Sequence, residues 1–188
     1  MRIDPATGLL DIAQQVVSPN CDERPEGCEP ELIVIHGISL PPGQFGGNGI
    51  DKLFTNQLDP SAHPYFAEIA GLRVSAHVMI RREGQIVQYV PFGKRAWHAG
   101  RSVYAGRQDC NDFSVGIELE GTDDIPYTGI QYQQLVQIIG ALFAAYPGLS
   151  EDRIAGHCDI APGRKTDPGP GFDWHRLRSS LKKRVGQA

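Results

Sequence analysis

The run ELIVIHGISL, from Glu31 to Leu40, constrains the fold more than any other stretch of this chain. Apolar residues occur at both parities within it, with Leu32 and Val34 on one parity and Ile33 and Ile35 on the other. Such a run, rich in β-branched residues, is typical of a strand in a sheet that is covered on both faces. We therefore expect a central strand here, with other elements packed above and below it.

His36 ends the apolar part of this run, and Gly37 follows it. The imidazole is therefore expected where a buried strand meets a loop, a place where a rigid element can support a ligand-binding side chain. A hydrogen-bonded core histidine is the alternative interpretation. The strand alone does not decide between the two.

A second run, SVGIELEG from Ser114 to Gly121, alternates apolar residues with polar or small ones. This period of two predicts a half-buried strand. Glu118 would project from the face opposite the apolar residues, beside Gly116, which leaves room next to the carboxylate. A solvated surface carboxylate is the alternative for both Glu118 and Glu120.

A Gly- and Pro-rich segment, GHCDIAPGRKTDPGP over residues 156–170, brings His157, Lys165 and Asp167 into one loop. Each proline fixes its own φ, and the glycines permit backbone angles that other residues avoid. Such a loop is costly to order unless it holds side chains in a fixed arrangement. An ordinary turn is the alternative, because Asp and Pro are common in turns.

Combined, the three segments supply the residue types of a catalytic zinc site. His36, His157 and Asp167 would be the ligands, and a fourth position would stay open for water, as in catalytic rather than structural zinc sites. Glu118 would carry a proton from water to a leaving amine. Lys165 would neutralise the oxyanion of a tetrahedral intermediate. These residue types favour amide hydrolysis over redox chemistry, but they do not identify the substrate.

The sequence resembles the N-acetylmuramoyl-L-alanine amidase family, which also includes peptidoglycan recognition proteins and phage T7-type lysozyme. The resemblance covers most of residues 32–174 and rests on VIHGISLPPGQFGG, HPYFAEIAGLRVSAHVMIRREGQIVQYVPFGKRAWHAG, CNDFSVGIELEGTD, YQQL and GHCDIAPGRKTDPGPGFDW. It implies the same three zinc ligands, the same acid/base glutamate and the same lysine. It also implies the bond cleaved, the amide between the lactyl group of (1,6-anhydro-)N-acetylmuramic acid and L-alanine of the stem peptide.

The resemblance further implies a role in cytoplasmic peptidoglycan recycling, which is linked in this family to control of inducible β-lactamase expression. The expected partner is a small soluble muropeptide. Two alternatives stay open: an amidase that acts on intact cell wall, and a muropeptide-binding module without catalysis. Sequences of this kind usually have Asn where this chain has Gly37, so we expect the contacts to the substrate peptide to differ there.

Four further residues are candidate substrate contacts. In RAWHAG, Trp97 offers an aromatic platform for a sugar or peptide face, and His98 offers a polar contact. Arg73 and Arg107 are candidates for a peptide carboxylate, because a guanidinium fork matches carboxylate geometry. Core packing of Trp97 and simple solvation of the arginines are the alternatives. We expect His77 to be a hydrogen-bonded structural histidine, and the alternative is a group that supports the site or faces the substrate.

Composition narrows the class of protein. With 188 residues, 40% hydrophobic and 21% charged, the chain fits one globular domain. The net charge of −4 argues against a nucleic-acid surface. The N-terminus lacks a signal-peptide pattern, and no run is long and apolar enough for a membrane span, so we expect a cytoplasmic protein with no membrane partner. We also expect a monomer. The four cysteines show no CxxC spacing and are expected to be reduced thiols.

The predicted organisation is a single α/β domain with a central mixed β-sheet flanked by α-helices. We expect an irregular leader over residues 1–30 and a zinc amidase domain over 31–188, with a loop at 41–49 that lines the substrate groove. A capping box at Thr128 and Gln131 predicts a helix start. The expected helices span 61–70, 128–146 and 173–185, and a β-hairpin joins 75–81 to 85–90.

Overall fold

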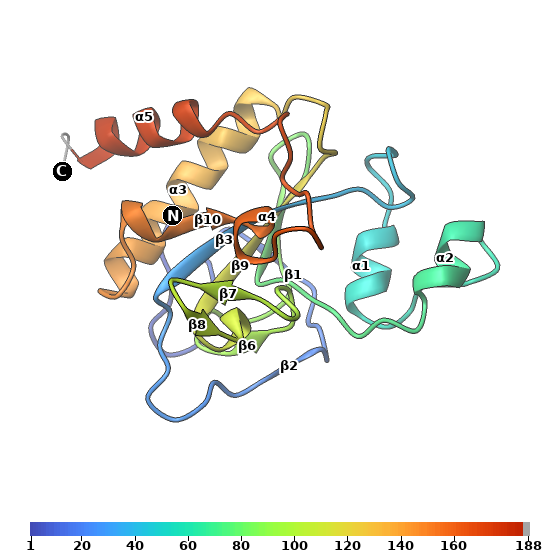
Figure 1. Cartoon of the computed structure of the whole chain (residues 1–188), viewed down its shortest axis with the longest axis horizontal. Helices are drawn as coiled ribbons and strands as arrows, with labels where there is room; N and C mark the ends of the chain where they lie inside the picture. The colour runs from blue at the N-terminus through green and yellow to red at the C-terminus, as the bar shows by residue number, and fades with distance from the viewer. Residues whose placement is uncertain (186–188) are drawn as a thin grey trace.

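The computed structural model describes residues 1–185, so the last three residues of the predicted 31–188 domain lie outside the described part. A six-stranded mixed sheet in the order β1-β5-β4-β9-β3-β10 forms the centre of the molecule (Figure 1). Neighbouring strands are parallel except β4 and β5, which form the predicted hairpin. The strands are β1 (Gln14–Gln15), β3 (Leu32–Ile38), β4 (Val78–Ile80), β5 (Ile86–Gln88), β9 (Ser114–Glu120) and β10 (Ile154–Gly156). The predicted α/β domain with a mixed sheet is confirmed.

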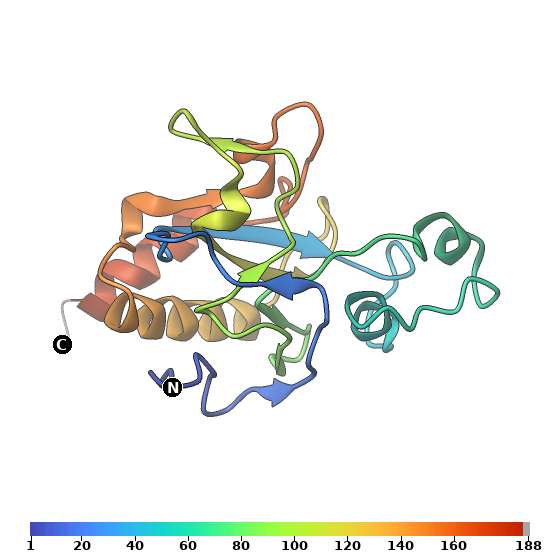
Figure 2. The same cartoon turned by 90° about the horizontal axis from the view of Figure 1, so that it is seen from below.

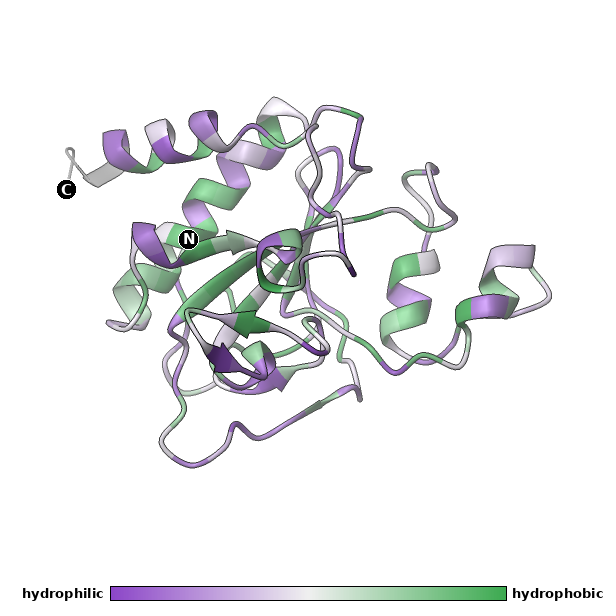
Figure 3. Cartoon of the chain, in the orientation of Figure 1, coloured by the Kyte–Doolittle hydropathy of each residue, from purple (hydrophilic) through white to green (hydrophobic). Residues whose placement is uncertain are grey.

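The central strand β3 is buried on both faces, as its two-parity pattern predicts. Ile33 and Ile35 join the cluster formed with the long helices, whereas Leu32 and Val34 pack into a separate cluster on the opposite face. That second cluster includes residues of the segment 95–113. Figure 3 colours much of β3 as hydrophobic, in contrast to the largely hydrophilic α5.

The neighbouring strand β9 departs from its prediction. All seven of its residues are buried, so the expectation of a half-buried strand is wrong. The apolar parity packs against the long helices, and on the other parity His98, from the segment that precedes β9, lies against Ser114 and Gly116. Glu118 and Glu120 also lie inside the protein, with 8% and 1% of their surface exposed.

Two helices cover one face of the sheet, α3 (Gly129–Ala145) and α5 (Trp174–Val185), and Figure 2 shows them together on that side. The predicted capping box starts α3. Thr128 Oγ1 accepts a bond from the Gln131 backbone N–H, and Gln131 Oε1 accepts one from the Thr128 backbone N–H. Both predicted helices are confirmed to within one or two residues.

Helices α1 (Gly49–Phe54) and α2 (Pro64–Ile69) lie beyond the carboxyl end of β3, on the right of Figure 1. Their apolar residues form a third cluster with Met79 and Tyr89. Helix α2 is shorter than the predicted 61–70 because Pro64 occupies its first turn and His63 caps it, accepting a bond from the Tyr65 backbone N–H. This end of the molecule forms one side of the cavity described below.

The N-terminal thirty residues run along the domain and add to its sheets. Strand β1 pairs with β5 in the main sheet, and β2 (Cys21–Asp22) pairs with β6 (Arg95–Ala96). The boundary between leader and domain stays a prediction. The remaining elements are β7 (Val103–Tyr104), β8 (Arg107–Gln108), η1 (Cys110–Asp112), η2 (Glu151–Arg153) and α4 (His157–Ile160). Within residues 1–185, no helix combines the length and apolar character needed to cross a membrane.

Candidate functional site

The pairing of β3 with β9 places two candidate site residues side by side. In this parallel ladder His36 is the register partner of Glu118. Partners in adjacent strands project to the same face. For both residues this is the face away from the long helices, so the imidazole and the carboxylate share one environment.

The third strand of this group, β10, brings His157 to the same edge. Gly156 pairs with Ile35 on β3, and α4 begins at the next residue, His157. The Asp159 carboxylate caps this short helix by accepting a 2.7 Å bond from the Gly156 backbone N–H. The following Gly/Pro-rich loop returns to α4, where the Cys158 N–H donates to the Asp167 carbonyl at 2.9 Å. Asp167 therefore lies next to His157.

The three predicted metal ligands converge on one point. His36 Nδ1 lies 2.9 Å from His157 Nδ1 and 3.3 Å from Asp167 Oδ2, and His157 Nδ1 lies 3.1 Å from the same carboxylate oxygen. Two ligands about 2.0–2.1 Å from zinc at the tetrahedral angle lie roughly 3.3 Å apart. The observed separations fit that geometry, so the three residues could hold a metal ion.

The protonation states of this cluster also suit a cation. Burial lowers the pKa of His36 to about 4, so its imidazole is neutral at pH 7. Burial alone would raise the pKa of Asp167, but the ring nitrogens of His157 and His36 beside its Oδ2 atom hold that pKa below its usual range, so Asp167 is a carboxylate. Neutral imidazoles and a half-buried carboxylate are acceptor groups that a bound cation would satisfy.

Glu118 lies beside this cluster, and its carboxyl group is buried. Its Oε2 atom is buried and has no hydrogen-bond partner within the described chain. Burial, followed by the negative charge of Asp167, raises the pKa of Glu118 well above its ordinary value, while Lys165 opposes the shift. A carboxyl group that holds a proton easily suits a general acid/base.

These groups line a cavity of about 630 Å³. Lys165 is exposed at its edge, near Asp167, and Pro42 and Gly43 of the loop after β3 line another part of it. Two positions of the 41–49 loop thus line this cavity, and the predicted role of the loop at a substrate groove stays a prediction. One apolar wall of the cavity is formed by residues from α1, α2 and the segment after α2, namely Leu53, Phe54, Tyr65, Ile69, Leu72 and Val74.

Sequence reasoning missed this apolar wall. Its residues come from α1, α2 and the turn after α2, and none carries a group that suggests chemistry. The spacing of Tyr65 and Ile69, four residues apart on one short helix, is a signal of a shared helix face. It does not reveal that this face borders a cavity.

The predicted substrate contacts His98 and Trp97 have other partners in the structure. His98 borders the cavity, but its Nδ1 lies 2.9 Å from His36 Nε2. Trp97 is half-buried, donates its indole N–H to Asp22 at 3.1 Å, and is not among the cavity-lining residues. The platform role of Trp97 stays a prediction.

The two predicted arginine contacts are exposed and bound locally. Arg73 donates to the carbonyls of Ala70 and Leu72, beside the cavity rim. Arg107 forms an ion pair with Glu31 at 3.0 Å, which directs its guanidinium to a different part of the surface. Neither arginine is among the cavity-lining residues, so both roles stay predictions.

Gly37, the position where an Asn was expected, has a structural reason to be glycine. A Cβ atom built there would overlap the hydroxyl of Tyr127, which donates a 3.0 Å bond to the Pro168 carbonyl. The phenol therefore fills the space that a side chain at this position would need. Its hydroxyl also ties the loop that carries Asp167 to the segment that precedes α3.

The fold and the cluster of two histidines, a carboxylate and a nearby buried glutamate belong to a known class of hydrolase. A family model described as N-acetylmuramoyl-L-alanine amidase matches residues 26–170, and the chain belongs to this family. The resemblance noted in the sequence is thereby confirmed. Within the family, the 1,6-anhydro-N-acetylmuramyl-L-alanine amidase AmpD of Escherichia coli (strain K12) is 62% identical over 176 residues, 94% of this chain and 96% of the relative.

Solved structures agree with the sequence match. The crystal structure of a selenomethionine AmpD derivative is 60% identical, with a TM-score of 0.93, and the match covers 96% of this chain and 99% of that one. The E. coli amidase AmiD, in complex with the substrate anhydro-N-acetylmuramic acid-L-Ala-D-γ-Glu-L-Lys, is 27% identical with a TM-score of 0.58. That match covers 84% of this chain and 60% of AmiD.

Proposed function

We propose that this protein hydrolyses the amide bond between the lactyl group of 1,6-anhydro-N-acetylmuramic acid and L-alanine of the stem peptide. One observation carries the proposal: His36, His157 and Asp167 converge at the wall of a cavity that also contains Glu118. Near-full-length similarity to AmpD, whose name states this amidase activity, supports the substrate.

We propose zinc as the metal of this site. Two imidazoles and one carboxylate form the ligand set of several catalytic zinc sites, with one position left open. A zinc ion held there would supply a Lewis acid that polarises the amide carbonyl and makes water a stronger acid. His36, His157 and Asp167 contribute by fixing three ligand atoms on rigid elements, two of them at the ends of adjacent strands.

Glu118 would act as the proton carrier. Its unpartnered Oε2 can accept a proton from the attacking water and then donate it to the nitrogen of the leaving L-alanine. The burial that raises its pKa makes the proton easy to accept. Lys165, at the cavity edge, would place a positive charge where the amide oxygen becomes negative in the transition state.

The cavity would orient the muropeptide because one side of it is apolar and a guanidinium group lies beside its rim. Tyr65 and Leu72 belong to an apolar side that suits the non-polar face of the sugar and its lactyl group. Arg73, beside the rim, is the guanidinium that we propose for a peptide carboxylate. The proposed physiological setting is peptidoglycan recycling in the cytoplasm, with a small soluble anhydromuramyl peptide as the partner.

Product analysis by mass spectrometry tests the proposal. Zinc-loaded protein should convert anhydromuramyl tripeptide into anhydro-N-acetylmuramic acid and free tripeptide, and should release little peptide from intact sacculi. Comparable release from sacculi would instead identify an amidase of intact wall. Binding of the muropeptide without cleavage would identify a non-catalytic binding module and overturn the proposal.

A further inference from the structure

Both candidate histidine ligands make their second ring contact with the same two consecutive residues. His36 Nε2 lies 2.9 Å from His98 Nδ1, and His157 Nε2 lies 3.4 Å from the carbonyl oxygen of Ala99. The remaining nitrogen of each ligand, Nδ1, faces the proposed metal. The segment His98–Ala99 therefore contacts both imidazoles on the side opposite the proposed metal.

The Ala99 carbonyl determines which nitrogen of His157 carries the proton. A carbonyl only accepts hydrogen bonds, so Nε2 of His157 must be the N–H donor, and Nδ1 of the neutral ring presents a lone pair. The same carbonyl accepts a 2.6 Å bond from Arg164, which holds it in place. His157 is thus fixed in the tautomer that a metal requires.

A longer chain of bonds leads to the same result for His36. Ser114 Oγ donates its only proton to the Cys110 carbonyl, so it must accept from His98 Nε2, 3.2 Å away. His98 then has a lone pair on Nδ1 and accepts from Nε2 of His36. The consequence is a lone pair on His36 Nδ1, directed at the same point as that of His157.

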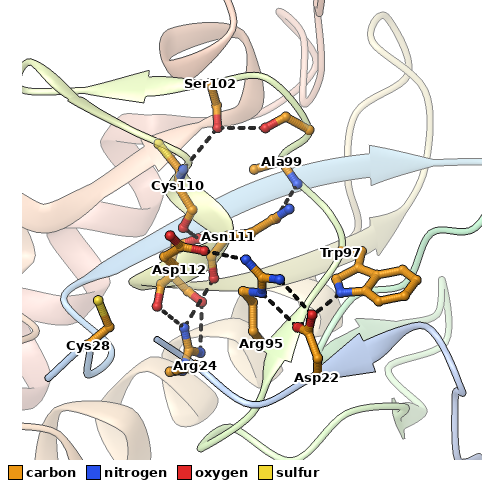
Figure 4. A network of polar contacts seen from close by, with 12 residues as sticks. Asp22, Arg24, Cys28, Arg95, Trp97, Ala99, Ser102, Cys110, Asn111 and Asp112 are labelled. Carbon is orange, nitrogen blue, oxygen red and sulfur yellow. Dashed lines mark hydrogen bonds and ion pairs between the residues drawn. The ribbon is translucent and has the colours of Figure 1, made fainter. Parts of the chain in front are cut away.

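The backbone of this segment is held by the side chain of Asn111, as Figure 4 shows. Asn111 Oδ1 accepts bonds from the backbone N–H groups of His98, at 3.1 Å, and Ala99, at 2.8 Å. The next residue, Asp112, forms an ion pair of 2.6 Å with Arg95, and Arg95 forms a second ion pair of 2.6 Å with Asp22. The network ties the support segment to the N-terminal residues.

Room for the His98 ring comes from a glycine on β9. A Cβ atom on Gly116 would lie 2.5 Å from His98 Cγ, closer than real contacts allow. Gly116, two residues before Glu118, therefore leaves space for the His98 ring. His98 is 9% exposed, so most of its ring lies within the protein.

We propose that His98 and Asn111 are positioning residues for the metal, acting through His36 and His157 rather than through the substrate. This inference rests on the proposed zinc site and replaces the expected substrate contact of His98 with a different role. Partners that fix the tautomer and ring orientation of metal ligands typically change metal affinity by about 10–100-fold when removed.

Zinc affinity, measured by competition with a chromophoric chelator on the purified full-length chain, tests this role. His98→Phe keeps a ring but removes its nitrogens, and Asn111→Ala releases the backbone of the segment. Each should weaken zinc binding by about 10–100-fold. Asn111→Asp keeps an acceptor oxygen at the same position and should bind zinc more tightly than Asn111→Ala. Asn20→Ala removes a buried amide that bonds the Phe54 and Val74 carbonyls, and should leave zinc affinity unchanged.

Two results would count against the inference. Folded His98→Phe and Asn111→Ala proteins that bind zinc as tightly as the parent chain would overturn it. If those variants fail to fold, Ser114→Ala, which removes one hydroxyl, provides the test: weaker zinc binding supports the inference and unchanged binding overturns it. A different outcome, in which His36→Ala still binds zinc like the parent chain, would mean that the proposed zinc site itself is wrong.

Discussion

Replacing His77 with asparagine should remove a large, calculable part of the acid sensitivity of this domain. His77 is fully buried, its Nδ1 accepts a 3.0 Å bond from the Gly116 N–H, and its Nε2 donates to the Lys94 carbonyl at 3.0 Å. Arg24 Nη2 lies 3.2 Å from the same Nε2. Protonation would break the Gly116 bond and place a second cation beside Arg24. Burial, followed by the charge of Arg24, therefore lowers the pKa of His77 to about 3.

The size of the effect follows from the two pKa values. The unfolded chain has a histidine pKa of about 6.5, so between pH 6.5 and pH 3 it binds a proton that the folded state does not. The free energy of unfolding therefore falls as the pH drops, by about 1.4 kcal/mol per pH unit from this group. Between pH 7.5 and pH 4.5 the loss reaches about 2.7 kcal/mol. Full stability returns above pH 6.5.

Urea unfolding of zinc-free protein at pH 7.5 and pH 4.5 measures this loss. Asn Oδ1 can replace the acceptor Nδ1, but the bond to Lys94 is lost, so His77→Asn should be less stable than the parent at pH 7.5. At pH 4.5 the difference in free energy of unfolding between this variant and the parent should be smaller by about 2.7 kcal/mol. His175→Gln, at an exposed position of α5, is the matched control and should follow the parent at both pH values. If the difference in free energy of unfolding between His77→Asn and the parent is the same at both pH values, His77 is not a source of the acid sensitivity.

Two further predictions concern the cavity residues Glu118 and Lys165, and a third concerns the nearby Glu120. Glu118→Gln should retain zinc and lose roughly 10²–10⁴ in rate, because the proton carrier is removed; near-normal turnover in a steady-state assay would move that role elsewhere. Lys165→Ala should lower kcat far more than it raises KM, with zinc content intact, whereas parent-like kinetics would place Lys165 outside the reaction. Glu120 accepts bonds from the Gly46 and Arg82 N–H groups, so Glu120→Gln should cost about 1–3 kcal/mol of stability in urea and leave zinc affinity unchanged; weaker zinc binding would contradict this structural role.

Sequence patterns predicted those elements that are determined by residues close together in the sequence. The two-parity apolar run identified β3 because burial on both faces affects every residue of the strand. Thr128 and Gln131 identified the start of α3 because a capping box involves residues three apart. The Gly- and Pro-rich character of residues 156–170 predicted the loop that carries Asp167, but His157, which was expected in the same loop, begins the short helix α4.

Such patterns could not predict contacts between segments that are far apart in the sequence. The period of two in β9 indicated one apolar face, and only the folded chain shows that His98 lies against Ser114 and Gly116 on the other face. Trp97 bonds to Asp22, 75 residues away, so its half-buried ring could not be distinguished from an exposed platform. Gly116 was interpreted as space for Glu118, whereas the structure gives that space to the His98 ring.

X-ray anomalous scattering at the zinc edge, from crystals grown with equimolar zinc, tests the central claim most directly. We expect a single strong peak roughly 2.0–2.2 Å from His36 Nδ1, His157 Nδ1 and Asp167 Oδ2. A peak at another place, such as the neighbouring Cys158 thiol, or no peak in crystals of active protein, would contradict it.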